Sequence, residues 1–173
     1  MNKLSILVFI ITVITYVHAV AVDVNKLYTR DSGDPIIATV ESEKVFCSFL
    51  PRGPGIEIGA SESDAIAFCS VPTVNAPNAA VFPKDLIRTM YFAQRDDYVQ
   101  ITGTINSNVY VVSTDPGGQY DPFAPQGASC HGYDTFVNLV EPNVDGSGIG
   151  HFCIRCCNGP DAKDNCPRGR SED

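Results

Sequence analysis

The chain has 173 residues, with 12 lysines and arginines against 20 aspartates and glutamates, which gives a formal net charge of −8. This negative balance argues against a nucleic-acid backbone or an anionic membrane surface as the partner. It is ordinary for a secreted protein and specifies no partner, and the length fits one domain around one core.

The first 19 residues have the order of a cleavable secretory signal. Lys3 supplies a positive charge, residues 4–17 are almost unbroken apolar sequence, and Ala19 ends the segment with a small side chain. A signal peptidase reads this order of charged, apolar and small residues. The apolar run is about 14 residues, whereas a membrane span needs roughly 20, so a removed leader is favoured over an anchor. We predict cleavage after Ala19, an extracellular protein and no membrane partner.

The mature chain is expected to begin with an extended lead-in over residues 20–43, followed by a β-rich disulfide domain over residues 44–166. Residues 45–50 are a plausible first strand, since they are apolar and are followed by a proline- and glycine-rich stretch that cannot continue regular structure. Residues 65–69 form a short buried element whose type its length leaves open. Residues 84–87 are expected to make a single helical turn.

The clearest pattern is a three-stranded meander over residues 90–114. Along residues 98–105, apolar and polar side chains alternate with period two, which is typical of a half-buried strand. Residues 90–92 are expected to precede this strand, and residues 109–114 to return beside it. The exposed face of the meander is the candidate contact surface, although a plain solvated face would show the same pattern. Its members are Tyr98, Gln100, Thr102 and Tyr110.

The rest of the chain continues the β pattern. A long loop is expected over residues 115–132, strands over residues 135–140 and 151–157, and a polar tail over residues 167–173. No stretch shows three turns of helical periodicity. The predicted fold is therefore all-β, as a single disulfide-containing sandwich or barrel-like antiparallel sheet.

Seven cysteines follow the signal, and an oxidising compartment favours three disulfides with one thiol left over. They are Cys47, Cys69, Cys130, Cys153, Cys156, Cys157 and Cys166. The pairing is open on sequence alone. Because Cys156 and Cys157 are neighbours in a strand, they face opposite sides and should find different partners, one in the core and one at an edge or in a loop. A metal site with Cys130, His131, His151 or Cys166, and a redox Cys-x-x-Cys pair, are less favoured alternatives.

No motif of an enzyme appears. The oxygen-rich residues 143–148 hint at calcium, but an EF-hand loop that starts at Asn143 would place its bidentate glutamate at Ile154. No catalytic residue, metal or cofactor is therefore predicted, and we expect a non-catalytic protein. One alternative is a cell-wall carbohydrate-binding module, and a secreted hydrolase with an unrecognised acid pair is another. The carbohydrate-binding module would stack sugars on Tyr110, Tyr120, Phe123 and Tyr133.

Several segments resemble a family of small secreted, cysteine-containing proteins of mucoromycete fungi, including arbuscular mycorrhizal ones. The resemblance is carried by residues 45–51, 61–64, 97–103, 136–142 and 152–157, in that order along the chain. More distantly, the chain is similar to fungal macrophage-activating glycoproteins. The resemblance implies a secreted fungal protein that works at the cell surface or host interface, as an effector in symbiosis or another host interaction. It implies no catalytic residue, and the partner would be a host or cell-wall component.

Overall fold

The computed structural model of the protein describes residues 34–167. The predicted signal peptide at residues 1–19, the lead-in as far as residue 33 and the tail from residue 168 lie outside these residues. The described chain is dominated by strands, so the all-β prediction is confirmed. None of its helices is long and apolar enough to cross a membrane.

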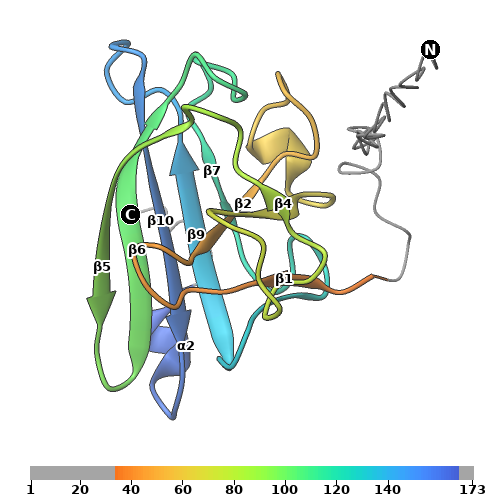
Figure 1. Ribbon diagram of the computed structural model, residues 1–173, viewed down its shortest axis with the longest axis vertical. Coiled ribbons are helices and arrows are strands. Elements are labelled where there is room, and N and C mark those ends of the chain that lie inside the picture. Colours follow the sequence, from red (N-terminus) through yellow and green to blue (C-terminus); the bar gives the residue numbers. More distant parts are fainter. Residues whose placement is uncertain (1–33, 168–173) are drawn as a thin grey trace, which may run out of the picture.

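The larger layer is a five-stranded antiparallel sheet (Figure 1). Its order from one edge to the other is β5, β6, β10, β9 and β7. The bounds are Ile87–Gln94 for β5, Tyr98–Asn106 for β6, Ile149–Cys157 for β10, Thr135–Glu141 for β9 and Gly118–Tyr120 for β7. Strand β10 lies at the centre because its alternating apolar residues pair along their whole length with β6 and over seven positions with β9.

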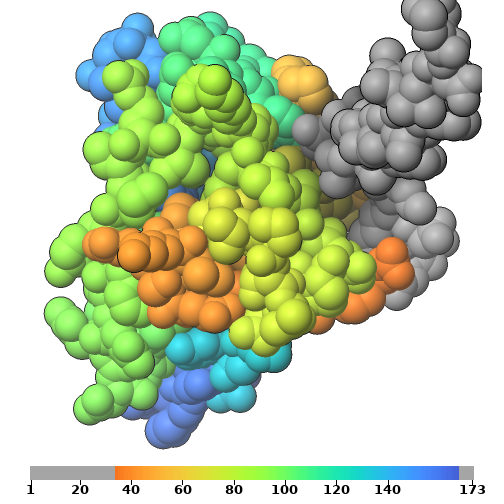
Figure 2. All heavy atoms as spheres, viewed as in Figure 1, coloured from red at the N-terminus to blue at the C-terminus, as the bar shows by residue number. Residues whose placement is uncertain are grey.

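The second layer is smaller and covers one face of this sheet, as the orange and yellow atoms in Figure 2 show. It contains the sheet β2 (Cys47–Leu50), β3 (Ile66–Cys69) and β4 (Ala80–Val81). Beside it, β1 (Ile36–Ala38) pairs in parallel with β8 (Ala128–Cys130). The β3–β4 pair is also parallel, so only the larger sheet is antiparallel throughout. The helices within residues 34–167 are short, η1 at Gly59–Ser61 and α2 at Ala162–Asn165.

The core between the layers is built on aromatic rings. Phe49 of β2 stacks on Phe136 of β9 with ring centroids 4.9 Å apart. Phe46 lies 6.1 Å from Phe152 of β10. All four rings are buried, and aromatic pairs at these spacings add stabilisation beyond the area they bury.

A buried asparagine ties the two layers together. Asn138 of β9 is fully buried, and its side-chain oxygen accepts hydrogen bonds from the Ser48 hydroxyl at 2.9 Å and from the Phe49 backbone N–H at 2.5 Å. Its amide nitrogen donates to the carbonyls of Leu139 and Cys153, each at 3.2 Å. The side chain therefore satisfies polar groups of three strands inside an otherwise apolar core.

The predicted third strand of the meander is wrong. Residues 109–114 form turns and bends, and β10 takes the place beside β6. Tyr110 has a positive φ of 74°, which an extended strand does not allow. Its ring meets Phe68 edge-on, and its hydroxyl donates to the Pro51 carbonyl. The segment therefore folds over the core instead of extending the sheet.

Three further elements differ from the sequence prediction. Residues 36–40, assigned to the lead-in, contribute Ile36, Ala38 and Val40 to the core. The long loop contains two short strands, β7 and β8. The expected helical turn is a tight turn leading into β5, because Asp85 adopts a positive φ of 63° that a helix does not allow.

Six of the seven cysteines form three disulfides, as predicted. The pairs are Cys47–Cys69, Cys130–Cys156 and Cys157–Cys166, and Cys153 is the free thiol. The adjacent Cys156 and Cys157 do face opposite sides of β10. Cys156 joins the core between the layers, and Cys157 ties α2 to the outer face.

Candidate functional site on the outer sheet face

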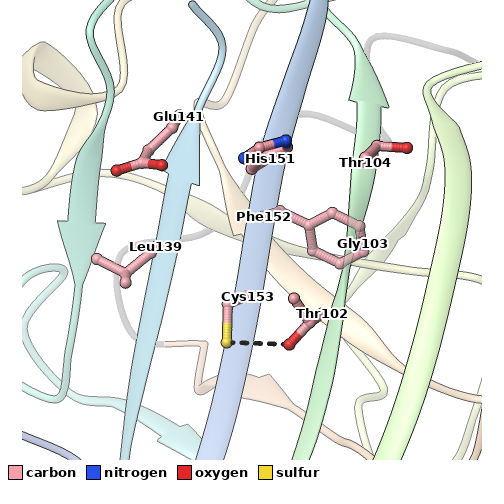
Figure 3. A pocket seen from close by; sticks show the side chains of 8 residues that line it. All are labelled: Thr102, Gly103, Thr104, Leu139, Glu141, His151, Phe152 and Cys153. Atoms are coloured by element: carbon pink, nitrogen blue, oxygen red, sulfur yellow. Dashed lines mark hydrogen bonds between the residues drawn. The ribbon is translucent and has the colours of Figure 1, made fainter. Parts of the chain in front are cut away.

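The outer face of the five-stranded sheet carries the candidate site. Strand register places Cys153 of β10 between Thr102 of β6 and Leu139 of β9. One row along, His151 lies between Thr104 and Glu141. These side chains, with Gly103 and Phe152, line a shallow groove of about 290 Å³ (Figure 3). We call this hollow the outer groove. Its six side chains are Thr102, Thr104, Leu139, Glu141, His151 and Cys153.

A polar ladder occupies the same face beyond one end of the groove. The Arg155 guanidinium donates to the Gln100 side-chain oxygen at 2.6 Å and lies 4.5 Å from the centre of the Tyr98 ring. Gln100 in turn donates to the Thr102 hydroxyl at 2.6 Å. A second nitrogen of Arg155 donates to the Asn165 carbonyl of α2 at 2.8 Å. The ladder therefore links α2 and its Cys157–Cys166 disulfide to the edge of the groove.

Cys153 contributes a thiol to the groove. Burial raises the pKa of its thiol, while a hydrogen bond from the Thr102 hydroxyl and the charge of Arg155 act in the opposite direction. The sulfur lies 3.6 Å from the Thr102 oxygen, a contact that Figure 3 marks. The thiol is therefore held in its neutral form at neutral pH, whereas a cysteine nucleophile needs a lowered pKa.

The structure gathers three of the four predicted contact residues. Tyr98, Gln100 and Thr102 share the outer face of β6, but the side chains of Tyr98 and Gln100 are half-buried and engaged with Arg155. Thr102 alone lines the groove. Tyr110 is not on this face, because that residue lies in a turn against the core.

Sequence reasoning missed the contributions of β9 and β10 to this face. Alternation along residues 135–141 and 149–157 places Leu139 with Glu141, and His151 with Cys153, on one face of each strand. The pattern does not tell which residues of the two strands lie opposite each other. Cross-strand register was therefore the missing information.

The aromatic residues of the carbohydrate alternative do not form a stacking platform. Tyr120 is fully buried, where burial raises its pKa and its hydroxyl bonds Ser61 at 2.7 Å. Tyr110 and Tyr133 are half-buried against the core, and Phe123 is 67 % exposed. A ring inside the core cannot stack on a sugar, so Tyr120 cannot belong to such a platform.

The two cysteines of the predicted metal set, Cys130 and Cys166, are engaged in disulfides. Cys130, Cys156, Cys157 and Cys166 are all in disulfides, and no three acidic, histidine or cysteine side chains cluster for a metal within residues 34–167. In the loop at residues 143–148, the Asn143 side-chain oxygen accepts from the Gly146 backbone. Asp145 accepts hydrogen bonds from the Ser147 hydroxyl and from the Ser147 backbone N–H, and these two bonds lower the pKa of its carboxyl. The loop oxygens therefore stabilise a turn.

The outer groove offers a mixed surface. Leu139, 37 % exposed, supplies an apolar floor, two threonine hydroxyls supply donors and acceptors, and Glu141 and His151 lie opposite each other on neighbouring strands. Such a combination suits a non-covalent contact in which an apolar group is flanked by polar ones.

Fold and site together define a small, disulfide-bonded, all-β domain with an open sheet face. The chain is similar to the appressorium protein ROW1 of Mycosarcoma maydis, at 26 % identity over 149 residues. That match covers 75 % of this chain but only 32 % of ROW1, so the chain spans about a third of the length of that relative. No known family matches the sequence, and no solved structure matches the chain.

Proposed function

We propose that this chain is a secreted, non-catalytic fungal protein that acts at the cell surface or host interface, as an effector in symbiosis or another host interaction. The similarity to a fungal appressorium protein carries the proposal most directly. Three disulfides add support, because such bridges persist in oxidising compartments outside the cytosol. The resemblance to small secreted proteins of mucoromycete fungi points the same way.

We assign the contact to the outer groove. It lies on the face of the five-stranded sheet opposite the second layer, and it combines an exposed leucine with hydroxyl groups and one carboxylate. A host or cell-wall protein surface with a small apolar projection would fit it. The Cys153 thiol forms part of the floor and stays protonated.

Retention on living cells tests this proposal. Leu139→Arg places a charge on the groove floor, and Val144→Arg puts the same charge on the exposed β9–β10 loop as a matched control. Oxidised, fluorescently labelled protein is incubated with fungal cells and with host tissue. We expect the wild type and Val144→Arg to be retained and Leu139→Arg to lose about tenfold or more of its binding, as expected for a charge buried in an apolar contact. Equal retention of all three would remove the groove as the contact surface.

A separate assay addresses the absence of catalysis. The purified protein is incubated with chitin, β-glucan and other wall polysaccharides, and new reducing ends are measured. The non-catalytic proposal predicts none above a heat-denatured control. Release of reducing ends that tracks the protein through purification would contradict it and restore the hydrolase alternative.

A further inference from the structure

Strand β5 forms one edge of the larger sheet. In the larger sheet β5 pairs only with β6, and nothing in residues 34–167 pairs with its other side. Strand β5 has eight residues, whereas β7 at the opposite edge has three (Figure 1). Long exposed edges offer a row of backbone donors and acceptors to another strand, and proteins usually shorten or cover them.

Register decides which backbone groups point outward. The Arg95 N–H donates to the Tyr98 carbonyl across the β5–β6 turn, so this pair is of the hydrogen-bonded kind. Hydrogen-bonded and non-hydrogen-bonded pairs alternate along an antiparallel ladder, so Met90, Phe92 and Gln94 belong to non-hydrogen-bonded pairs with β6. The backbone groups of these three residues therefore point away from β6. One of these outward groups, the Gln94 carbonyl, accepts a hydrogen bond at 3.0 Å from the exposed side chain of the next residue, Arg95.

An apolar hollow of about 180 Å³ lies beside this edge, between β5 and the second layer. Phe46, Phe82, Pro83, Ile87 and Met90 line it, together with Glu43. An added strand sends alternate side chains to the two faces of a sheet. Every second side chain of a strand docked on β5 would therefore point toward the face that holds the hollow.

We propose that the β5 edge binds the β5 edge of a second copy of this chain, antiparallel, to make one continuous ten-stranded sheet. The outward residues form a self-complementary set when Phe92 lies on the two-fold axis, because Met90 then faces Gln94 of the other copy. The same register brings the exposed Arg88 of each copy to the exposed Asp96 in the β5–β6 turn of the other. This charge match occurs twice, and the symmetry needs no second kind of surface.

Other features of the edge agree with a specific partner. The bulge between Ile87 and Thr89 ends regular pairing at one end, and the turn at Arg95 ends it at the other. Only a short central stretch is left open, which limits uncontrolled growth of the sheet. The net charge of −8 opposes association at long range, so the dimer should form more readily as salt screens it.

Sedimentation velocity on the oxidised protein tests the proposal over a concentration series. We expect a monomer–dimer equilibrium. Met90→Lys, which puts a charge at the hollow, should weaken the dimer by about tenfold or more. Tyr91→Lys is the matched control, because Tyr91 is 67 % exposed on the opposite face of the same strand, and it should leave the dimer unchanged.

A charge exchange separates a second copy from any other partner. Arg88→Asp should weaken the dimer, and so should Asp96→Arg, because each single change places like charges together. The double variant Arg88→Asp/Asp96→Arg should recover it, since the two charges are only exchanged. A chain that stays monomeric at every concentration overturns the proposal. So does a dimer that Met90→Lys leaves intact, one that the double variant fails to restore, or one that Cys153→Ser abolishes, which would place the contact at the free thiol.

Discussion

The buried amide of Asn138 offers the sharpest test of how the two layers are joined. Replacement by leucine keeps a side chain of similar size and removes all of its hydrogen bonds. The Phe49 N–H and the Ser48 hydroxyl would then face an apolar group in the core. Neither group is near water, because both residues are buried.

The expected loss follows from those orphaned groups. A buried donor left without a partner costs about 1–3 kcal/mol; the Phe49 N–H becomes such a donor, and the Ser48 hydroxyl keeps only its long contact with the Phe49 carbonyl at 3.5 Å. The added apolar burial of leucine returns part of this cost, at about 1.5–3 kcal/mol for a whole side chain. A net loss of about 2 kcal/mol is therefore expected, which is a large fraction of the stability of a domain of this size.

Urea unfolding without reductant measures this loss, since intact disulfides keep the transition comparable between variants. Asn78→Leu is the matched control, because Asn78 is exposed and makes one long bond to the Pro35 carbonyl at 3.5 Å. It should change stability by less than about 0.5 kcal/mol. An Asn138→Leu protein as stable as the control would refute the proposed tie between the layers.

Three further outcomes are expected. Gly103→Ala should destabilise the protein by about 1–3 kcal/mol in the same urea assay, because a Cβ there would lie 2.0 Å from a backbone oxygen of β5, while Gly59→Ala, where nothing lies within 4 Å, should be neutral. Burial raises the pKa of Cys153, so its alkylation in the native protein should rise with pH later than in urea, and an earlier rise would contradict the burial. The raised pKa also makes the free energy of unfolding depend on pH. The contribution of Cys153 to this free energy is fully present below the thiol pKa of the unfolded chain, and it is lost as the pH rises through the higher thiol pKa of the folded protein. Replacing Cys157 and Cys166 together by serine should cost about 2–3 kcal/mol, read from the urea midpoint, and an unchanged midpoint would show that the bridge adds nothing.

Strand periodicity predicted β6, β9 and β10 well, because each has one face in the core and the other outside. The alternation along residues 98–105 corresponds to the buried and exposed sides of β6. The short strands β7 and β8 carry too few residues for a period to show, and their neighbours are prolines and glycines. Their pairing depends on tertiary contacts that local sequence does not contain.

Strand order was harder to predict than strand position. Residues 109–114 are rich in β-branched side chains, which favours a strand next to β6. The longer β10 occupies that place, and the segment turns at Tyr110 to cover the core. Long-range competition of this kind cannot be read from a local window.

For the cysteines, too, the local orientation could be predicted from the sequence and the long-range pairing could not. Adjacent Cys156 and Cys157 had to face opposite ways, and this prediction is confirmed. Their partners come from β8 and from the end of α2, positions set by the whole fold. The candidate site was also predictable only in part. Alternation along the strand identified Thr102, whereas Leu139 and His151 could be assigned to the site only from the cross-strand register.

Export into an oxidising environment is the claim on which the functional account depends. The most direct measurement is N-terminal sequencing and thiol labelling of the protein from its native cells, with medium and cytosol analysed separately. The account predicts extracellular protein that begins near residue 20, with six bridged cysteines and label on Cys153 alone. Full-length protein found in the cytosol, with Met1 retained and all seven thiols labelled, would contradict it.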